Sequence, residues 1–194
     1  TINLNRDPRW GRNVESPGES PLLNGLYGTM YTKGLQGDDP NVVQTTVTLK
    51  HWIAYSVEDY DGVTRHTYDA NVTAYDLANS YFPAFEMTVK TGGALGIMCS
   101  YNELNGKPTC GNPALTEVLR GDWGFKGYIT SDTDAVADIC RSHHYEPNMQ
   151  LATRDGLLAG CDINSGNTYK DNLQPAVEAG LVNISYARKA LENS

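Results

Sequence analysis

The sequence predicts an α/β fold in which a parallel sheet carries helices on its outer side. Two observations lead to this prediction. Short apolar or β-branched runs alternate with segments of helical periodicity, and polar residues directly follow the apolar runs. The active sites of parallel α/β folds lie at the carboxyl ends of the strands. We therefore expect these polar residues to form a single site.

Four short runs have the composition of buried strands. They are Thr45 to Leu49, Ala94 to Cys99, Gly127 to Thr130 and Gly160 to Ile163. The polar residues at their ends are Lys50-His51, Ser100-Tyr101, Ser131-Asp132 and Asp162. Four strands are too few to close an eight-stranded barrel, so a barrel of this kind would be incomplete here.

Apolar spacing and capping residues predict the first two helices. The first runs from Pro21 to Leu35 and has apolar residues at helical spacing, namely Leu22, Leu23, Leu26, Tyr27, Met30 and Tyr31. Thr73 with Asp76 indicates the N-cap of the second, which runs to about Lys90. Pro83 is expected to kink or split it, because proline cannot donate a helical hydrogen bond.

The rest of the chain is predicted from the same signals. Asn112-Pro113 opens a helix that Gly121 ends, and Glu58 to Asp69 is predicted to be a long polar loop. The remaining predicted helices are Met149 to Ala159, Leu173 to Ala179 and Ser185 to Leu191.

Composition excludes several classes of function. The 194 residues carry a formal net charge of −8, with no run rich in lysine or arginine, which disfavours binding to a phosphate backbone. No apolar stretch approaches the roughly 20 residues that span a bilayer, so we expect no membrane contact. The length suits one domain or part of one. Because Thr1 to Leu4 resembles the end of a buried strand, we expect residues 1–194 to be an internal fragment.

The cysteines and two glycosylation motifs bear on the compartment. The four cysteines form neither a CxxC motif nor a cluster with histidine, so we expect no structural zinc, and their even number permits two disulfides. Adjacent histidines rarely face one ion, so His143-His144 is interpreted as part of a loop. Possible glycosylation at Asn71 and Asn183, each within an Asn-x-Ser/Thr motif, fits a secreted, extracellular protein.

The segment from Asn5 to Glu19 is the densest polar motif. It places three arginines, one aspartate and two glutamates around Trp10. Pro, Trp and Gly between the charges favour a fixed, partly buried shape over a solvated loop. Arginine suits bidentate bonds to carboxylates or sugar hydroxyls, and tryptophan offers an apolar face to a sugar ring.

This motif resembles the N-terminal domain of glycoside hydrolase family 3. The matching residues are Arg6-Asp7-Pro8-Arg9-Trp10-Gly11-Arg12 with Glu15-Ser16-Pro17-Gly18-Glu19, then Lys50-His51, Arg65, Met98 to Asn102 and Gly127 to Asp132. Within the family, Val63 to Arg65, Ser131 to Val136 and Cys161 to Gly166 look most like the β-xylosidase branch.

The resemblance implies an (α/β)8 TIM-type barrel, here without its first strands and without the C-terminal α/β sandwich domain. It also implies a retaining enzyme that uses two carboxyl groups to remove single sugars from the non-reducing end of β-linked glycans. For this chain we expect xylose release from xylo-oligosaccharides and no cofactor. The alternatives are a β-glucosidase, an α-L-arabinofuranosidase side activity and a non-catalytic carbohydrate-binding barrel.

The resemblance assigns roles residue by residue. Asp132 matches the nucleophile, although a Ser-Asp pair after a strand also often caps the next helix. The residues that match sugar-binding positions are Arg12, Lys50, His51 and Arg65, with Tyr101 beside the nucleophile and Met98 in the pocket wall. Glu15, Glu58 and Asp134 are further candidate ligands.

Two expectations concern cysteines and the second carboxyl group. Some secreted members of the family join cysteines arranged as Cys99 and Cys110 are, which leaves Cys140–Cys161 as the other pairing, with free thiols as its alternative. The family's general acid/base is usually a glutamate on the C-terminal domain. No glutamate of this chain can be assigned that role by matching, so we expect the isolated fragment to bind sugar weakly and turn over little.

Overall fold

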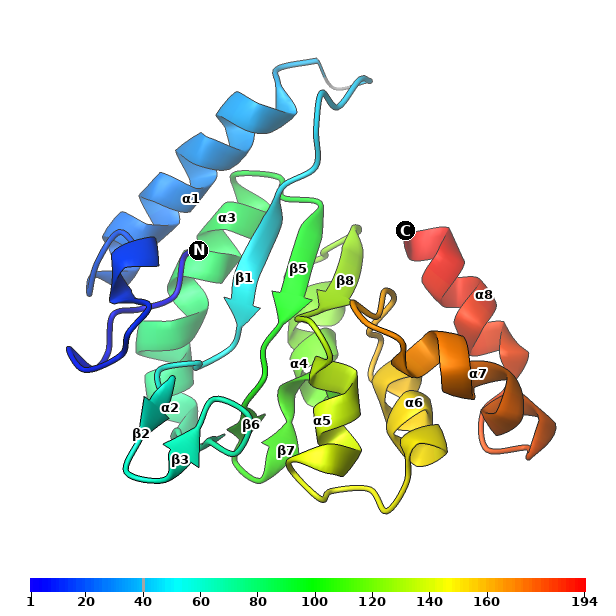
Figure 1. Cartoon of the computed structure of the whole chain (residues 1–194). Helices are drawn as coiled ribbons and strands as arrows, with labels where there is room; N and C mark the ends of the chain where they lie inside the picture. Colours follow the sequence, from blue (N-terminus) through cyan, green and yellow to red (C-terminus); the bar gives the residue numbers. More distant parts are fainter. Residues whose placement is uncertain (40) are drawn as a thin grey trace.

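The computed structural model describes residues 1–39 and 41–194. At its centre lies the predicted parallel sheet, formed by β1 (Thr48–Trp52), β5 (Gly96–Cys99) and β8 (Tyr128–Ser131) in the order β1-β5-β8. All three strands run in the same direction, so their carboxyl ends share one edge (Figure 1). The fold is therefore mixed α/β, as the sequence predicts.

The two faces of the sheet differ in character. Leu49, Ile97 and Ile129, one from each strand, are buried in a core with residues of α3 (Phe82–Lys90) and α4 (Pro113–Glu117). The alternate residues Met98 and Thr130 are half-buried on the opposite face. Side chains of a strand alternate between faces, so one face of this sheet is apolar and covered by helices, and the other is mixed and more open.

Helix α1 (Pro21–Gln36) is present as predicted, with Ser20 as its N-cap. Its apolar side, however, does not face the core, as the apolar side of a helix usually does. It packs on α3 through small and polar residues: a Cβ at Gly28 would lie 2.6 Å from Thr88 Oγ1. The apolar residues that revealed the helix are instead 47% to 68% exposed, namely Leu22, Leu23, Leu26, Tyr27, Met30 and Tyr31. Periodicity therefore located the helix and not its buried face.

The second predicted helix is interrupted before Pro83. Thr73 Oγ1 accepts from the Asp76 N–H at 3.0 Å, which confirms the N-cap. The chain then passes through α2 (Ala74–Asp76), the π-helical η2 (Leu77–Tyr81) and α3. Proline has no N–H to donate to a helical hydrogen bond. The hydrogen-bonding pattern changes just before Pro83, so no such bond is lost at this position.

Two predictions about strands need correction. The predicted loop Glu58 to Asp69 contains a hairpin of β2 (Asp59–Tyr60) and β3 (Val63–Thr64), and ends in β4 (Asp69–Ala70). The predicted strand Gly160 to Ile163 is reduced to a single bridge between Thr130 and Ile163. The Asp162 and Ile163 N–H groups both donate to Ile129 O, at 2.7 and 3.0 Å, so a regular ladder does not form.

The remaining elements surround the sheet edge and its helical face. A small second sheet joins β4 to β6 (Glu103–Leu104) and β7 (Lys107–Pro108). The other elements are η1 (Asn13–Glu15), η3 (Thr109–Gly111), η4 (Val118–Asp122, π-helical), α5 (Ala135–Arg141), α6 (Met149–Leu158), α7 (Thr168–Glu178) and α8 (Ile184–Asn193). Helix α5 was not predicted from the sequence, and α7 begins five residues before its predicted start.

One of the two expected disulfides is present. Cys99 and Cys110 are joined, with Cα atoms 5.2 Å apart, which ties the end of β5 to η3. The expected Cys140–Cys161 bond is wrong, since both residues are free. The Cys161 thiol instead lies 4.0 Å from Cys99 Sγ and donates to Ile163 O at 3.5 Å. Burial raises the pKa of Cys161 to about 12.

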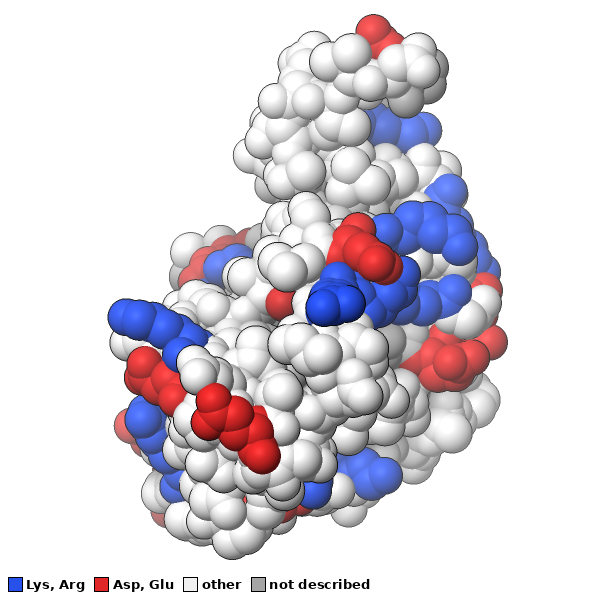
Figure 2. Space-filling view, turned by 90° about the vertical axis from the view of Figure 1, so that its right-hand side faces the viewer, with Lys and Arg blue, Asp and Glu red and all other residues white. Residues whose placement is uncertain are grey.

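The surface bears on two other expectations. Asn71 and Asn183 are exposed, so glycosylation at these positions stays a prediction. On the face shown in Figure 2, several basic side chains gather at the centre right, and acidic side chains lie beside them. Across residues 1–39 and 41–194, no helix combines the length and apolar character needed to cross a membrane.

The cysteine assignment predicts a specific labelling pattern. Alkylation of the denatured protein without reductant, read by peptide mass spectrometry, is expected to label Cys140 and Cys161, and Cys99 and Cys110 only after reduction. Labelling of all four without reductant would contradict the Cys99–Cys110 bond. Protection of Cys140 and Cys161 would instead restore the second disulfide.

Candidate active site

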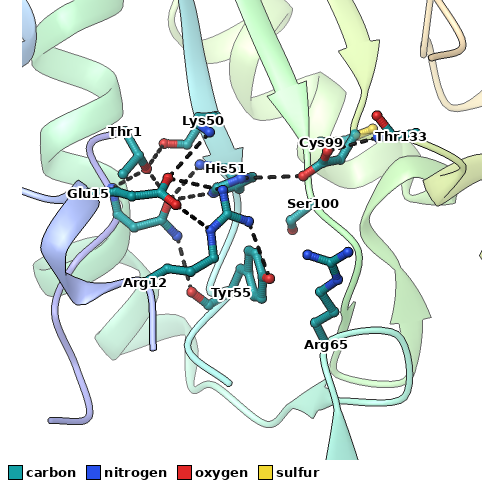
Figure 3. Close-up of polar contacts among 12 residues, drawn as sticks. Thr1, Arg12, Glu15, Lys50, His51, Tyr55, Arg65, Cys99, Ser100 and Thr133 are labelled. Atoms are coloured by element: carbon teal, nitrogen blue, oxygen red, sulfur yellow. Dashed lines mark hydrogen bonds and ion pairs between the residues drawn. The ribbon is translucent and has the colours of Figure 1, made fainter. Parts of the chain in front are cut away.

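The carboxyl edge of the sheet gathers the polar side chains that the sequence singled out. Lys50 and His51 come from β1, Tyr101 follows β5, and Asp132 follows β8. Figure 3 shows Arg12 reaching the same region from the N-terminal segment and Arg65 from the loop after β3. The Asp132 N–H donates to Cys99 O at 3.0 Å, so its position follows from the pairing of β8 with β5.

The Asp132 carboxylate has one bound and one unbound oxygen. Oδ1 accepts from the Thr133 N–H at 2.8 Å. Oδ2 is buried and has no hydrogen-bond partner among the described residues, although it lies 3.3 Å from His51 Nε2. A buried acceptor without a hydrogen bond costs free energy, and such groups are typical of functional sites.

The alternative role of Asp132 as a helix cap finds no support in this geometry. The N-cap position of α5 belongs to Asp134, which has φ = 63° and makes no side-chain capping bond. The Asp132 carboxylate bonds to the adjacent Thr133 and not to the first turn of α5. Asp134 itself was a candidate ligand, and it is exposed at the start of α5.

His51 is held as a neutral ring. Its Nδ1 lies 2.9 Å from Asn3 Oδ1, which can only accept, so the ring proton belongs on Nδ1. The side chain is 1% exposed, and this burial, with the charges of Arg12 and Lys50, lowers its pKa to about 2. The Nε2 lone pair therefore faces the Asp132 side of the site as an acceptor for a hydroxyl group.

Glu15 joins two of the candidate sugar-binding cations. It accepts two bonds from Arg12, at 2.7 Å from Nε and 3.0 Å from Nη2, and lies 3.4 Å from Lys50 Nζ. The hydrogen bonds from Arg12 lower the pKa of Glu15 to about 2. The Arg12 guanidinium also donates to Tyr55 OH at 3.4 Å. Glu15 thus lies among the predicted residues and fixes the two cations beside each other (Figure 3).

Glu58 holds Arg65 as Glu15 holds Arg12. Its Oε1 accepts from Arg65 Nη1 at 3.1 Å, and its Oε2 accepts from Tyr55 OH at 2.5 Å and Trp10 Nε1 at 3.2 Å. Trp10 is only 3% exposed. The expectation that its ring offers a face to a sugar is therefore wrong, because Trp10 packs against Tyr55 inside the fold.

Tyr101 and Met98 complete the predicted set. Burial, followed by the nearby charge of Asp132, raises the pKa of Tyr101 to about 12, so its phenol stays protonated beside the carboxylate. The Arg65 guanidinium carbon lies 4.4 Å from the centre of the Tyr101 ring. Met98 is half-buried on the open face of β5, one residue before the strand ends at Cys99. Across the described residues, no group of three or more His, Cys, Asp or Glu side chains is placed to hold a metal ion.

Sequence reasoning missed two residues that organise the site. Asn3 Oδ1 accepts from Thr1 Oγ1 at 2.5 Å, from the His51 backbone N–H at 2.7 Å and from the His51 ring. Tyr55 links Arg12 to Glu58. Asn3 was visible only as a polar residue within a strand-like segment, and Tyr55 only as a residue that follows β1, so neither carried a distinctive signal.

The fold and the site define an α/β domain with a cluster of charged and polar side chains at the carboxyl edge of a parallel sheet. Residues 1–193 match the model of the glycosyl hydrolase family 3 N terminal domain. The chain belongs to this family.

Among curated relatives, beta-D-xylosidase 3 of Arabidopsis thaliana is 43% identical over the whole chain and 26% of the relative. Beta-xylosidase/alpha-L-arabinofuranosidase 2 of Medicago sativa subsp. varia is 42% identical over the same shares. The chain thus spans about a quarter of the length of these relatives.

Solved structures agree with this assignment. A GH3 exo-beta-xylosidase (XlnD) in complex with a xylobiose aziridine probe superposes with a TM-score of 0.94 at 35% identity, over 97% of this chain and 25% of the other. The beta-glucosidase of Listeria innocua in complex with glucose gives 0.88 at 31% identity, over 99% of this chain and 27% of the other.

The neutral state of His51 predicts a pH dependence of stability. Burial lowers the pKa of the folded ring to about 2, whereas the unfolded ring has a pKa near 6.5. The contribution of the neutral ring to the free energy of unfolding is therefore present above pH 6.5 and lost as the pH falls. Below that value the wild type is expected to lose up to about 1.4 kcal/mol of unfolding free energy per pH unit more than His51→Asn. Urea unfolding at pH 7, 6 and 5 measures this difference, and parallel slopes would contradict it.

Proposed function

We propose that the whole protein is a retaining, exo-acting glycoside hydrolase that releases β-linked xylose from the non-reducing end of xylo-oligosaccharides, and so acts in xylan breakdown. The observation that carries this proposal is the buried Oδ2 of Asp132 at the end of β8, which has no hydrogen-bond partner within residues 1–39 and 41–194. The names of the relatives, which are β-xylosidases in the curated comparison, support xylose as the released sugar.

The proposed reaction uses two steps. Asp132 Oδ2 attacks the anomeric carbon, the bond to the leaving oxygen breaks, and a general acid protonates that oxygen. Water then attacks the glycosyl-enzyme, the same group now accepting the proton of the water, and the sugar leaves with its configuration retained. In this proposal the general acid/base is carried by another part of the whole protein, and this chain supplies the nucleophile and the sugar-binding groups.

Each candidate sugar-binding residue has a defined task. Arg12 and Lys50, held together by Glu15, present N–H donors to ring hydroxyls, and His51 Nε2 presents an acceptor. Hydrogen bonds between charged donors and hydroxyls that shorten as the ring flattens stabilise the transition state more than the ground state. Tyr101 keeps its proton beside Asp132 and can donate a hydrogen bond to the carboxylate, which leaves the carboxylate charged.

The fold proposal extends the sheet to a barrel. We propose that β1, β5 and β8 are consecutive strands of an (α/β)8 barrel. Helices cover one face of the sheet and a half-open, mixed face lies opposite, as the wall of a barrel requires. Between Thr48 and Tyr128, whose hydroxyls lie 2.6 Å apart, a Cβ at Gly96 would come within 2.8 Å of both, so the glycine allows the strands to pack at this position.

We further propose that the protein is secreted. The Cys99–Cys110 disulfide supports this, because such bonds persist in oxidising compartments. The exposed Asn71 and Asn183 are then available for glycosylation.

A β-glucosidase is the second candidate. The structural likeness to the Listeria innocua enzyme in complex with glucose favours it. The two activities differ in whether the pocket accepts a hydroxymethyl group at sugar C5.

The nucleophile assignment predicts the behaviour of one variant. In the full-length protein, Asp132→Ala is expected to lower kcat for an aryl β-xyloside by on the order of 10³-fold or more, because no covalent intermediate can form. Asp171→Ala, at an exposed position of α7, is the matched control and is expected to stay near wild type.

Steady-state rates with aryl β-xyloside and aryl β-glucoside, measured side by side, test this assignment and the sugar preference together. An Asp132→Ala rate within tenfold of wild type would exclude the nucleophile role. A higher kcat/KM for the glucoside would assign the protein as a β-glucosidase.

A further inference from the structure

The side chain of His66 lies between Arg65 and Asp138. Its Nδ1 is 2.7 Å from Asp138 Oδ2, and its Nε2 accepts from Arg65 Nε at 3.2 Å. Asp138 belongs to α5 and is 6% exposed, and its Oδ1 accepts from Ser142 Oγ at 2.7 Å. A buried carboxylate with both oxygens engaged is a fixed anchor for the histidine ring.

The donors and acceptors specify one state of this ring. A carboxylate only accepts and Arg65 Nε only donates, so the bonds on both sides require a neutral imidazole with its proton on Nδ1. The ring also packs edge-on against Tyr101, with centroids 4.8 Å apart. His66 is thereby held by Asp138 on one side and holds Arg65 on the other.

These contacts fix Arg65 at three points. Nε is bonded to His66, Nη1 is bonded to Glu58, and the guanidinium carbon lies 4.4 Å from the Tyr101 ring centre. In the part of the chain that the structure describes, these bonds engage two of the three nitrogens, and the third, Nη2, can serve a ligand. The side chain is 34% exposed, so a ligand can reach it.

Helix α5 connects this arrangement to the candidate nucleophile. It begins at Ala135, three residues after Asp132, and Asp138 lies within its first turn. Helix α5 thus follows directly after the segment that carries Asp132, and through Asp138 and His66 it also holds the Arg65 guanidinium.

We propose that His66 and Asp138 are positioning residues that fix the orientation of Arg65, so that its Nη2 donates to a sugar hydroxyl beside Asp132. The inference rests on the proposed function, in which Arg65 contacts the sugar. It predicts that the two polar atoms of His66 matter and that its ring packing does not.

Two substitutions separate these contributions. His66→Phe keeps an aromatic ring against Tyr101 and removes both hydrogen bonds. His66→Gln loses the ring, but its amide offers one donor and one acceptor. In the full-length protein, His66→Phe is expected to lower kcat/KM for an aryl β-xyloside about tenfold, and His66→Gln to recover most of this loss. If the ring of His66 served packing alone, His66→Gln would lower kcat/KM more than His66→Phe.

A double-mutant cycle with Arg65→Ala tests whether His66 acts through Arg65. In the Arg65→Ala background, His66→Phe is expected to change kcat/KM less than about twofold, since the group it positions is gone. Asp138→Asn is expected to resemble His66→Phe in a milder form, with Asp171→Asn as the exposed control on α7. Thermal unfolding of each variant reports any separate loss of stability.

The outcomes are distinguishable. An active wild type in which His66→Phe matches wild type, or in which the losses from His66→Phe and Arg65→Ala multiply, would overturn the positioning role and leave the proposed function standing. A wild type that hydrolyses no aryl glycoside would overturn the proposed function and the positioning role with it.

Discussion

The parallel pairing of β1, β5 and β8 determines where the candidate functional side chains lie. With Met98 opposite Thr130 and Cys99 opposite Ser131, the strands end at the same level, and Asp132 takes its position from a hydrogen bond to Cys99 O. The Cys99–Cys110 disulfide fixes that strand end from the other side. A slip of one residue would turn each of these side chains to the opposite face.

Carboxylates other than Asp132 organise the cations of the site. Glu15 binds Arg12 and Lys50, and Glu58 binds Arg65. These bonds hold the cations in place before any ligand arrives, which lowers the cost of reorganisation on binding. The Asp132 Oδ2 is left without a hydrogen-bond partner among the described residues. The acidic residues of the site thus divide into those that position cations and one that is available for chemistry.

Much of this arrangement could be predicted from the sequence, since strand ends followed by polar residues are a local pattern. Local patterns fail at three places, where contacts between distant segments decide. The apolar residues that predict α1 do not show which of its sides packs, because α1 meets α3 through Gly25 and Gly28, where close approach is possible. Trp10 is enclosed by Tyr55 and Glu58, which lie more than 40 residues away in the chain.

The third failure is the pairing of the cysteines. The family resemblance paired Cys99 with Cys110 and left Cys140 and Cys161 as a second pair or as free thiols; both are free, and the fold places Cys161 against Cys99. Asn3 is a residue whose role in the site the sequence did not indicate. Two of its three accepted bonds hold His51, and nothing in a four-residue strand-like segment indicates that role.

The most direct test of the account is mechanism-based trapping on the full-length protein. A 2-fluoro-xylosyl donor with a good leaving group allows the glycosyl-enzyme to form and slows its hydrolysis, because fluorine destabilises the oxocarbenium-like transition state. Peptide mass spectrometry is expected to find the xylosyl label on Asp132. Labelling from a 2-fluoro-glucosyl donor alone would retain the mechanism and change the sugar. A label on another residue, or no label from either donor while sugar still binds, would contradict the account.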